Sequence, residues 1–331
     1  MPTALITGIT GQDGSYLTDL LLEKGYEVHG IVRRTSSLER SRLHHLYHDP
    51  EKYGKSLFLH YADLDDTTTL RRLMITAAPD EVYHLAGQSH VGLSFEIPES
   101  TTKMTGLATL RILEMIQDLE KVPRFFHASS SELFGKPEEI PQNEGTPFRP
   151  VNPYGAAKTF ATNMVSIYRN AFGIYAVNGI MFNHESPRRG ENFVTRKICR
   201  AAAAIKQGRQ KELLLGDTSA KRDWGHAKDY VRAMWLSLRH AAAEDYIFAT
   251  GKLHSVQDVV DTAFGTVDLD AAKYVRQDER FMRPVEPQRL VGDPSKAKRL
   301  LNWEPLITFH EMIREMTLAE MKHISSETTQ G

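Results

Sequence analysis

The sequence predicts an α/β fold: a doubly wound, parallel Rossmann-type sheet with a smaller, partly interleaved C-terminal α/β domain. Short apolar runs alternate with segments of helical periodicity, and neighbouring parallel strands need such crossovers. The motif Gly8-Ile-Thr-Gly11-Gln-Asp-Gly14 lies between an apolar run and a helical pattern, where a strand-to-helix turn is expected. The alternation loosens from His184 onward, which predicts a second lobe.

The expected elements follow in chain order. Apolar runs predict strands at 4–7, 26–32, 57–61, 81–85, 124–128 and 174–182. Helical periodicity predicts helices at 15–24, 67–77, 105–119 and 154–172. Later segments predict helices at 193–206, 256–263, 295–301 and 309–321 and a short strand at 212–215, and we expect 226–238 and 246–250 to return to the first domain. We therefore expect a first domain at 1–182 with 222–254, a second at 183–221 with 255–322, and a disordered tail at 323–331.

Length, charge and cysteine content exclude several classes of protein. A chain of 331 residues can bury a large core without a disulfide or a metal. The single cysteine, Cys199, excludes an internal disulfide framework and fits a reducing compartment, and we expect its side chain to be buried. The net charge of −1, with both signs interspersed, predicts no surface for nucleic acid or anionic membranes. No apolar run could span a bilayer, so a soluble cytoplasmic protein is expected.

The glycine motif predicts a phosphate site at the start of the first helix. Free N–H groups and the helix dipole favour an anion there, and a Cβ would block a close approach to the backbone. The GxxGxxG spacing resembles that of short-chain dehydrogenases/reductases, whereas an ordinary tight turn is the alternative. The candidate cofactor residues in this turn are Gly8, Thr10, Gly11, Gln12, Asp13 and Gly14.

The residues after the second expected strand indicate NADP rather than NAD. An acidic residue here would bind the ribose 2′-hydroxyl of NAD, whereas this chain carries Arg33, Arg34, Thr35 and Ser36. Two guanidinium groups and two hydroxyls suit a 2′-phosphate. A solvated basic loop or a subunit contact is the alternative. Further candidate cofactor contacts follow the third and fourth strands: Asp63, Leu64, Leu85, Ala86, Gly87, Gln88 and Ser89.

Tyr154 and Lys158 form a candidate catalytic pair, four residues apart on one helix face. A phenol that acts as a base near pH 7 needs its pKa lowered by roughly three units, or about 4 kcal/mol. One ammonium about 4 Å away supplies on the order of 4 kcal/mol at an effective dielectric near 20. Lys158 is therefore sufficient in principle to lower the pKa of Tyr154, and an oxidised nicotinamide would add positive charge, although an amphipathic surface pair would show the same spacing.

A hydroxyl-rich strand end supplies the other candidate catalytic residues. Ser130 can hydrogen-bond a substrate hydroxyl that is being oxidised. Glu132 lies two residues further on, hence on the same side if the extended chain continues. Its carboxylate could remove a proton next to a new ketone and then protonate a leaving hydroxyl. The alternative is a solvent-facing loop carboxylate.

Six segments resemble the GDP-mannose 4,6-dehydratase family, within the extended short-chain dehydrogenases/reductases: TGITGQDGSYL, VRRTSS, SSSELFG, NPYGAAK, FNHESPRRGENFVTRKI and KRDWGHAKDYVRAMW. The resemblance extends to about Met321. It implies catalytic roles for Ser130, Glu132, Tyr154 and Lys158. It also implies that Tyr154, Lys158, His184 and Arg189 contact the cofactor. The substrate contacts that it implies are Ser89, Ser130, Asn183, Lys197, Arg222, Arg283 and Glu286.

The residues and the resemblance together imply that GDP-mannose is converted to GDP-4-keto-6-deoxymannose. Hydride would pass from C4 to bound NADP and return to C6, with loss of water. The resemblance also implies a homodimer or homotetramer. Open alternatives are another GDP-sugar such as a GDP-heptose, an epimerase or 4-keto reductase that does not need Glu132, and a non-catalytic NADP-binding module. Lys197 and Arg222 could also be exposed charges without a ligand.

Overall fold

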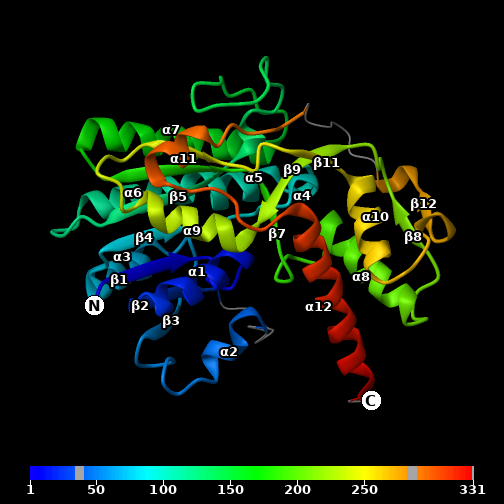
Figure 1. Cartoon of the computed structure of the whole chain (residues 1–331). Helices are drawn as coiled ribbons and strands as arrows, with labels where there is room; N and C mark the ends of the chain where they lie inside the picture. The colour runs from blue at the N-terminus through cyan, green and yellow to red at the C-terminus, as the bar shows by residue number, and fades with distance from the viewer. Residues whose placement is uncertain (34–40, 282–288, 330–331) are drawn as a thin grey trace.

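Seven parallel strands form the central sheet of the computed structural model, which describes residues 1–33, 41–281 and 289–329 (Figure 1). Their order across the sheet is β10-β6-β5-β4-β1-β2-β3. The bounds are β1 (Thr3–Thr7), β2 (Glu27–Val32), β3 (Leu57–Tyr61), β4 (Glu81–His84), β5 (Arg124–Ser130), β6 (Ala176–Met181) and β10 (Asp245–Phe248). The predicted doubly wound sheet is therefore confirmed, and the chain reverses its direction of travel across the sheet between β1 and β4.

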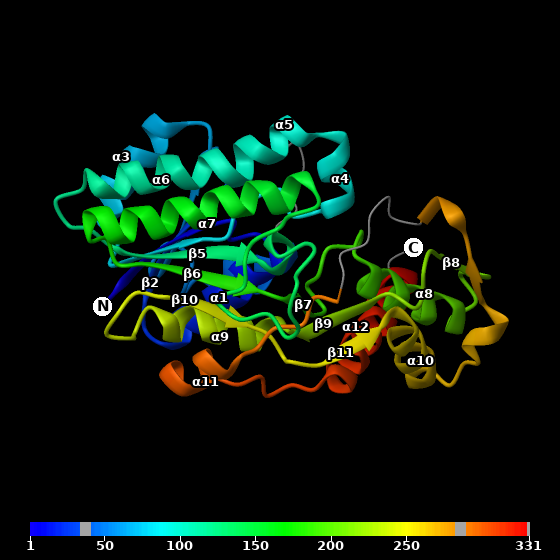
Figure 2. The same ribbon diagram turned by 90° about the horizontal axis from the view of Figure 1, so that it is seen from above.

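Helices cover both faces of this sheet (Figure 2). One face is covered by α1 (Gln12–Glu23) and α9 (Ala227–Ser237), which share a core with Val28, Tyr83 and Phe248. The other face is covered by α3 (Thr67–Ala77), α6 (Ala108–Gln117) and α7 (Pro153–Phe172). Shorter elements lie between these: η1 (Ser41–Leu43), α2 (His44–Tyr47), α4 (Val91–Glu96), α5 (Pro98–Thr101), the π-helical η2 (Thr102–Leu107) and η3 (Ser131–Leu133).

A second lobe with its own core lies beyond the carboxyl ends of the strands. Its helices are α8 (Val194–Lys206), α10 (Val256–Thr266) and α12 (Phe309–Thr329). A two-stranded sheet of β8 (Leu213–Leu215) and β12 (Val275–Gln277) lies beside them, with η4 (Ala271–Lys273) and η5 (Glu279–Phe281). A third sheet, β11-β9-β7, lies at the junction of the lobes and consists of β7 (Asn183–Glu185), β9 (Lys221–His226) and β11 (Leu253–Ser255).

Two expectations about the C-terminal part need correction. Helix α11 (Ser295–Leu301) and Trp303 belong to the core of the first domain, although 255–322 was expected in the second. The Trp303 ring packs edge-on against Tyr230 and Phe248, which explains why this apolar segment leaves the second lobe. The expected tail does not begin at residue 323, because α12 continues to Thr329. No helix of the described ranges is long and apolar enough to cross a membrane.

Candidate active site

The glycine turn after β1 lies at the point where the strand order reverses, which is where ligands bind in such sheets. Gly8 has a φ of +75°, and a Cβ on it would lie 2.8 Å from the amide nitrogen of Ala86 in the loop after β4. Gly11 is the N-cap of α1, and no side chain of the described residues forms a capping hydrogen bond with this helix. The first-turn N–H groups are therefore suited to an external anion, and the turn fits the pyrophosphate of a dinucleotide.

The side chains of Gln12 and Asp13 connect this turn to β7. Gln12 donates a hydrogen bond to the His184 carbonyl at 3.0 Å and accepts one from Ser186 at 2.8 Å. The Asp13 carboxylate lies 2.9 Å from Nε2 of His184. Burial alone would raise the pKa of Asp13, but the His184 charge and hydrogen bond more than offset it and lower this pKa. Burial disfavours a charged His184, yet Asp13 raises the pKa of the imidazole.

Thr10 lies in this turn, and the charge of Arg189 acts on the Asp13 carboxylate beside it. The Thr10 carbonyl accepts a hydrogen bond from Arg42, whose guanidinium also donates to the Arg188 carbonyl. Arg189 stacks on Phe193 and forms an ion pair with Glu185. Arg33 lies exposed just after β2, whereas Arg34, Thr35 and Ser36 lie outside the described residues. Arg42 was not expected, since it lies 32 residues from Thr10 in the sequence.

The loops after β3 and β4 contain the other predicted cofactor residues. Leu64 is buried, and Asp63 accepts a hydrogen bond from the Asp65 amide. The Gln88 side chain hydrogen-bonds the His90 backbone, so it holds its own loop. Other members of the predicted set, Leu85, Ala86, Gly87 and Ser89, lie in the loop that follows β4, next to the glycine turn.

Ser130 and Glu132 lie together, but not for the reason that the sequence suggested. The extended chain ends at Ser130, and 131–133 form the 3₁₀ turn η3. The expected continuation of the strand is therefore wrong. The Ser130 hydroxyl instead accepts a hydrogen bond from the Glu132 amide at 3.3 Å. The Glu132 side chain is buried, which excludes the alternative of a solvent-facing carboxylate.

Asn152 is a contact of Glu132 that the sequence analysis missed. Its amide nitrogen donates to Oε2 of Glu132 at 2.8 Å, and its oxygen accepts from the Gly155 amide at 2.7 Å. Asn152 is thus the N-cap of α7, with Pro153 as the first helical residue. An Asn-Pro pair before a helical pattern was a readable signal for the cap, but the contact with Glu132 depends on tertiary structure.

Tyr154 and Lys158 both lie buried on α7, with different electrostatics from those expected. Burial raises the pKa of Tyr154 to about 12, a hydrogen bond with Ser130 opposes this rise, and the Glu132 charge adds to it. Lys158 does not reverse the rise: its ammonium donates to the Ala128 carbonyl at 2.6 Å and lies 5.9 Å from the Tyr154 ring centre. Burial also lowers the pKa of Lys158 to about 8. The expectation that Lys158 by itself lowers the Tyr154 pKa is therefore wrong.

Two buried histidines lie near Lys158. His84 hydrogen-bonds the Thr7 hydroxyl at 2.8 Å, and its ring is stacked 5.8 Å from that of His127. Burial lowers the pKa of His84 to about 3, and the Lys158 charge adds to the effect. Burial likewise holds the pKa of His127 well below its usual value. Both rings are therefore neutral near pH 7 and add no positive charge beside the Lys158 ammonium.

Three of the expected substrate residues, Asn183, Arg222 and Lys197, lie in the junction sheet and the second lobe. Asn183 begins β7 and pairs in register with Trp224 of β9, so Arg222 lies on the neighbouring strand. Lys197 on α8 donates to the Leu214 carbonyl at 2.7 Å and lies 3.8 Å above the Phe281 ring. Arg222 is buried rather than exposed. Arg283 and Glu286 lie outside the described residues.

The Rossmann-type sheet and the grouping of Ser130, Tyr154 and Lys158 beside its glycine turn define the chain as a short-chain dehydrogenase/reductase. The family model described as GDP-mannose 4,6 dehydratase matches residues 5–316. The chain belongs to the GDP-mannose 4,6-dehydratase family.

Individual relatives agree with this family. GDP-mannose 4,6 dehydratase 1 of Arabidopsis thaliana is 51% identical over 95% of this chain and 88% of its own length. The GDP-mannose 4,6 dehydratase of Homo sapiens is 48% identical over 96% and 91%. Among solved structures, a dTDP-glucose 4,6-dehydratase of Streptomyces venezuelae with NAD and TYD bound has a TM-score of 0.86 at 23% identity, covering 98% of each chain. RMD of Pseudomonas aeruginosa, complexed with NADPH, has a TM-score of 0.81 at 24% identity, covering 98% of this chain and 100% of its own.

Proposed function

We propose that this chain dehydrates GDP-mannose to GDP-4-keto-6-deoxymannose with a bound nicotinamide cofactor. The observation that carries the proposal is the buried Glu132 carboxylate, held beside Ser130 on a turn that follows the hydroxyl-rich strand end. A simple oxidation or epimerisation at C4 needs a hydroxyl, a phenol and an ammonium, but no carboxylate. Loss of water needs a group that removes the proton from C5 and protonates the hydroxyl oxygen on C6, and Glu132 is suited to that role.

The protein residues then have separate roles. Ser130 orients the C4 hydroxyl, and Tyr154 takes its proton. Glu132 removes the C5 proton, which the new C4 ketone acidifies, and protonates the C6 hydroxyl so that it leaves as water. The 4-keto-5,6-ene that remains takes the hydride back at C6 and a proton at C5, which gives the 6-deoxy product. The cofactor, when bound at the glycine turn, supplies a reversible hydride acceptor and a positive charge. That charge complements Lys158 near a phenol whose pKa burial raises to about 12.

An isotope experiment tests this proposal. GDP-mannose carrying deuterium at C4 is incubated with the protein and NADP, and the product is analysed by mass spectrometry and NMR. We expect a product lighter by one water, with the deuterium at C6 and no free NADPH accumulating. Deuterium retained at C4 or lost to solvent would contradict an intramolecular hydride route. A panel of other GDP-sugars, including a GDP-heptose, measures which sugar is preferred.

We propose NADP as the cofactor and the second lobe as the GDP-sugar site. Arg33 supports NADP because it follows β2, which pairs with β1 beside the glycine turn. Lys197 and Arg222 support the sugar-nucleotide site, since cations suit a diphosphate, and Asn183 lies on β7, which pairs with the strand that carries Arg222. Calorimetric titration with NADP and with NAD tests the first point, and tighter binding of NAD would overturn it.

We propose that the chain forms a homodimer through helices α4 and α7. Leu93, Phe95 and Ile97 at α4 and Phe160 and Ile167 on α7 are exposed apolar side chains. The last two are seven residues apart, hence on one side of α7, and both helices lie on the same side of the molecule (Figure 2). Sedimentation equilibrium of the wild type tests this, and a monomer at micromolar concentration would contradict it. A tetramer in the same experiment would show that a further surface takes part.

A further inference from the structure

Asn152 is placed between the proposed acid/base carboxylate and the helix that carries Tyr154 and Lys158. One end of its amide donates to Oε2 of Glu132 at 2.8 Å, and the other accepts from the Gly155 amide at 2.7 Å. The side chain is buried, and among the described residues it is the one side chain that hydrogen-bonds the Glu132 carboxylate. The two backbones are also close, because a Cβ on Gly155 would lie 2.6 Å from the Glu132 carbonyl oxygen.

We propose that Asn152 is a positioning residue for the dehydration step. It orients the Glu132 carboxylate toward the sugar and connects this carboxylate to the start of α7. The inference rests on the proposed dehydratase function. A carboxylate that moves a proton from C5 to the C6 hydroxyl must keep a constant orientation through both transfers. An amide suits this task because it donates to a carboxylate without titrating, whereas its oxygen simultaneously caps the helix.

Substitutions can separate the two hydrogen bonds of Asn152, the one that caps α7 and the one that orients Glu132. Serine and aspartate are good N-caps, so Asn152→Ser and Asn152→Asp retain the hydrogen bond to Gly155 but lose the amide donor. Asn152→Asp also places a second carboxylate against Glu132. Asn152→Ala loses both contacts. Ser255→Ala is the matched control, since Ser255 caps α10 through the Asp258 amide and has no contact with Glu132.

The variants are compared in single turnovers with GDP-mannose and stoichiometric NADP, by the absorbance of bound NADPH and by thermal melting without ligands. With slower water loss and intact C4 oxidation, bound NADPH should accumulate. We expect this in Asn152→Ser and more strongly in Asn152→Asp, with water loss slowed roughly ten- to a hundred-fold. The melting temperature of Asn152→Ser should stay near that of the wild type, whereas Asn152→Asp, which buries a second carboxylate beside Glu132, Asn152→Ala and Ser255→Ala should melt earlier. Ser255→Ala should not accumulate NADPH.

Two results would count against the proposal, and they are distinguishable. If Asn152→Ser and Asn152→Asp lose water at the wild-type rate while Asn152→Ala is merely less stable, Asn152 is a helix cap alone. If the wild type itself releases no water from any GDP-sugar, the proposed dehydratase function fails, whatever the variants do.

Discussion

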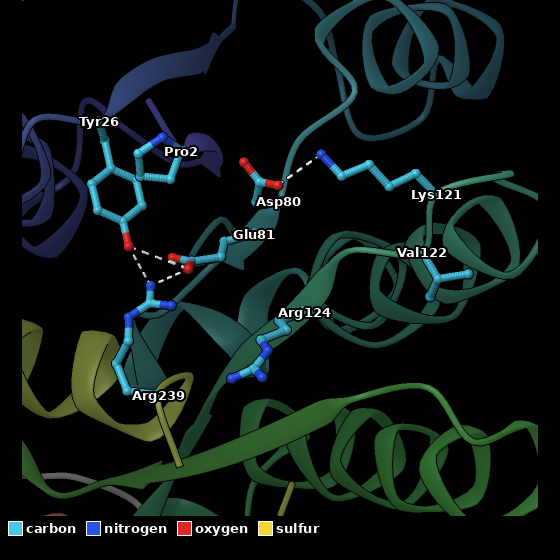
Figure 3. Close-up of a pocket in the computed structure, with 8 residues that line it drawn as sticks. All are labelled: Pro2, Tyr26, Asp80, Glu81, Lys121, Val122, Arg124 and Arg239. Carbon is cyan, nitrogen blue, oxygen red and sulfur yellow. Dashed lines mark hydrogen bonds and ion pairs between the residues drawn. The ribbon is translucent and has the colours of Figure 1, made fainter. Parts of the chain in front are cut away.

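The two edges of the central sheet both contain buried charged groups, but they use them differently. At the amino edge, Glu81 accepts a hydrogen bond from Tyr26 at 3.3 Å and forms an ion pair with Arg239 (Figure 3). It also accepts a hydrogen bond from Tyr83 at 2.7 Å. At the carboxyl edge, Glu132 is bound by the neutral amide of Asn152, and Lys158 by the Ala128 carbonyl.

The two edges therefore differ in the partners of their charged groups: charges pair with charges at one edge, and with neutral groups in the case of Glu132 and Lys158 at the other. The cavity at the amino edge, about 470 Å³, is lined by charges that pair with one another, such as Asp80 with Lys121 at 2.7 Å. Pairing satisfies buried charges and leaves little for a ligand. Neutral partners at the carboxyl edge leave the charges of Glu132 and Lys158 available to a reacting molecule.

The largest expected effect comes from Glu132→Gln. This substitution keeps the shape of the side chain but removes its capacity to move a proton, so the rate of water loss should fall roughly 10²- to 10⁴-fold. C4 oxidation should continue, visible as bound NADPH in a single turnover. The free energy of unfolding should change little, because Asn152 can still donate to an amide oxygen. Retained water release would show that another group does this work.

The same chemical change at the amino edge should have the opposite outcome. Glu81→Gln leaves Arg239 without its ion partner, and breaking a buried pair destabilises by about 3 kcal/mol where one partner is partly exposed. Denaturant unfolding measures this loss. The rate of product formation per folded molecule should equal that of the wild type. A fall in that rate with unchanged stability would remove the contrast between the two edges.

The smallest effect concerns pH and the link between Asp13 and His184. The pKa of His184 is raised above 6.5, so its contribution is complete below about pH 6.5 and is lost as pH rises through the folded-state pKa. The pKa of Asp13 is lowered, so its contribution is lost only at acid pH, below about 4. His184→Gln should therefore cost on the order of 1 kcal/mol near pH 6 and less near pH 8. An equal cost at both values would contradict a charged His184.

Local patterns predicted most elements because their signals are contained in neighbouring residues. Helices α3 and α11 begin and end at the predicted residues, and Cys199 is buried as expected, with burial raising its thiol pKa to about 12. The short strands β7, β9 and β11 were missed, since three to six residues with polar members carry no clear period. The first-domain position of α11 was also missed, because helical periodicity does not say which core an apolar face will join.

The sequence by itself predicted the parallel sheet and the glycine turn. It also singled out Ser130, Glu132, Tyr154 and Lys158 as the hydroxyl, carboxyl, phenol and amine of the candidate site. Strand and helix periodicity and the geometry of glycine are properties of short segments, which explains why they could be read. Only the tertiary structure decided that Glu132 is buried on a 3₁₀ turn against Asn152, and that Tyr154 is held with a pKa of about 12. The burial and the hydrogen-bond partners of these two side chains come from residues distant in the chain, and they determine the charge and the orientation of the side chains.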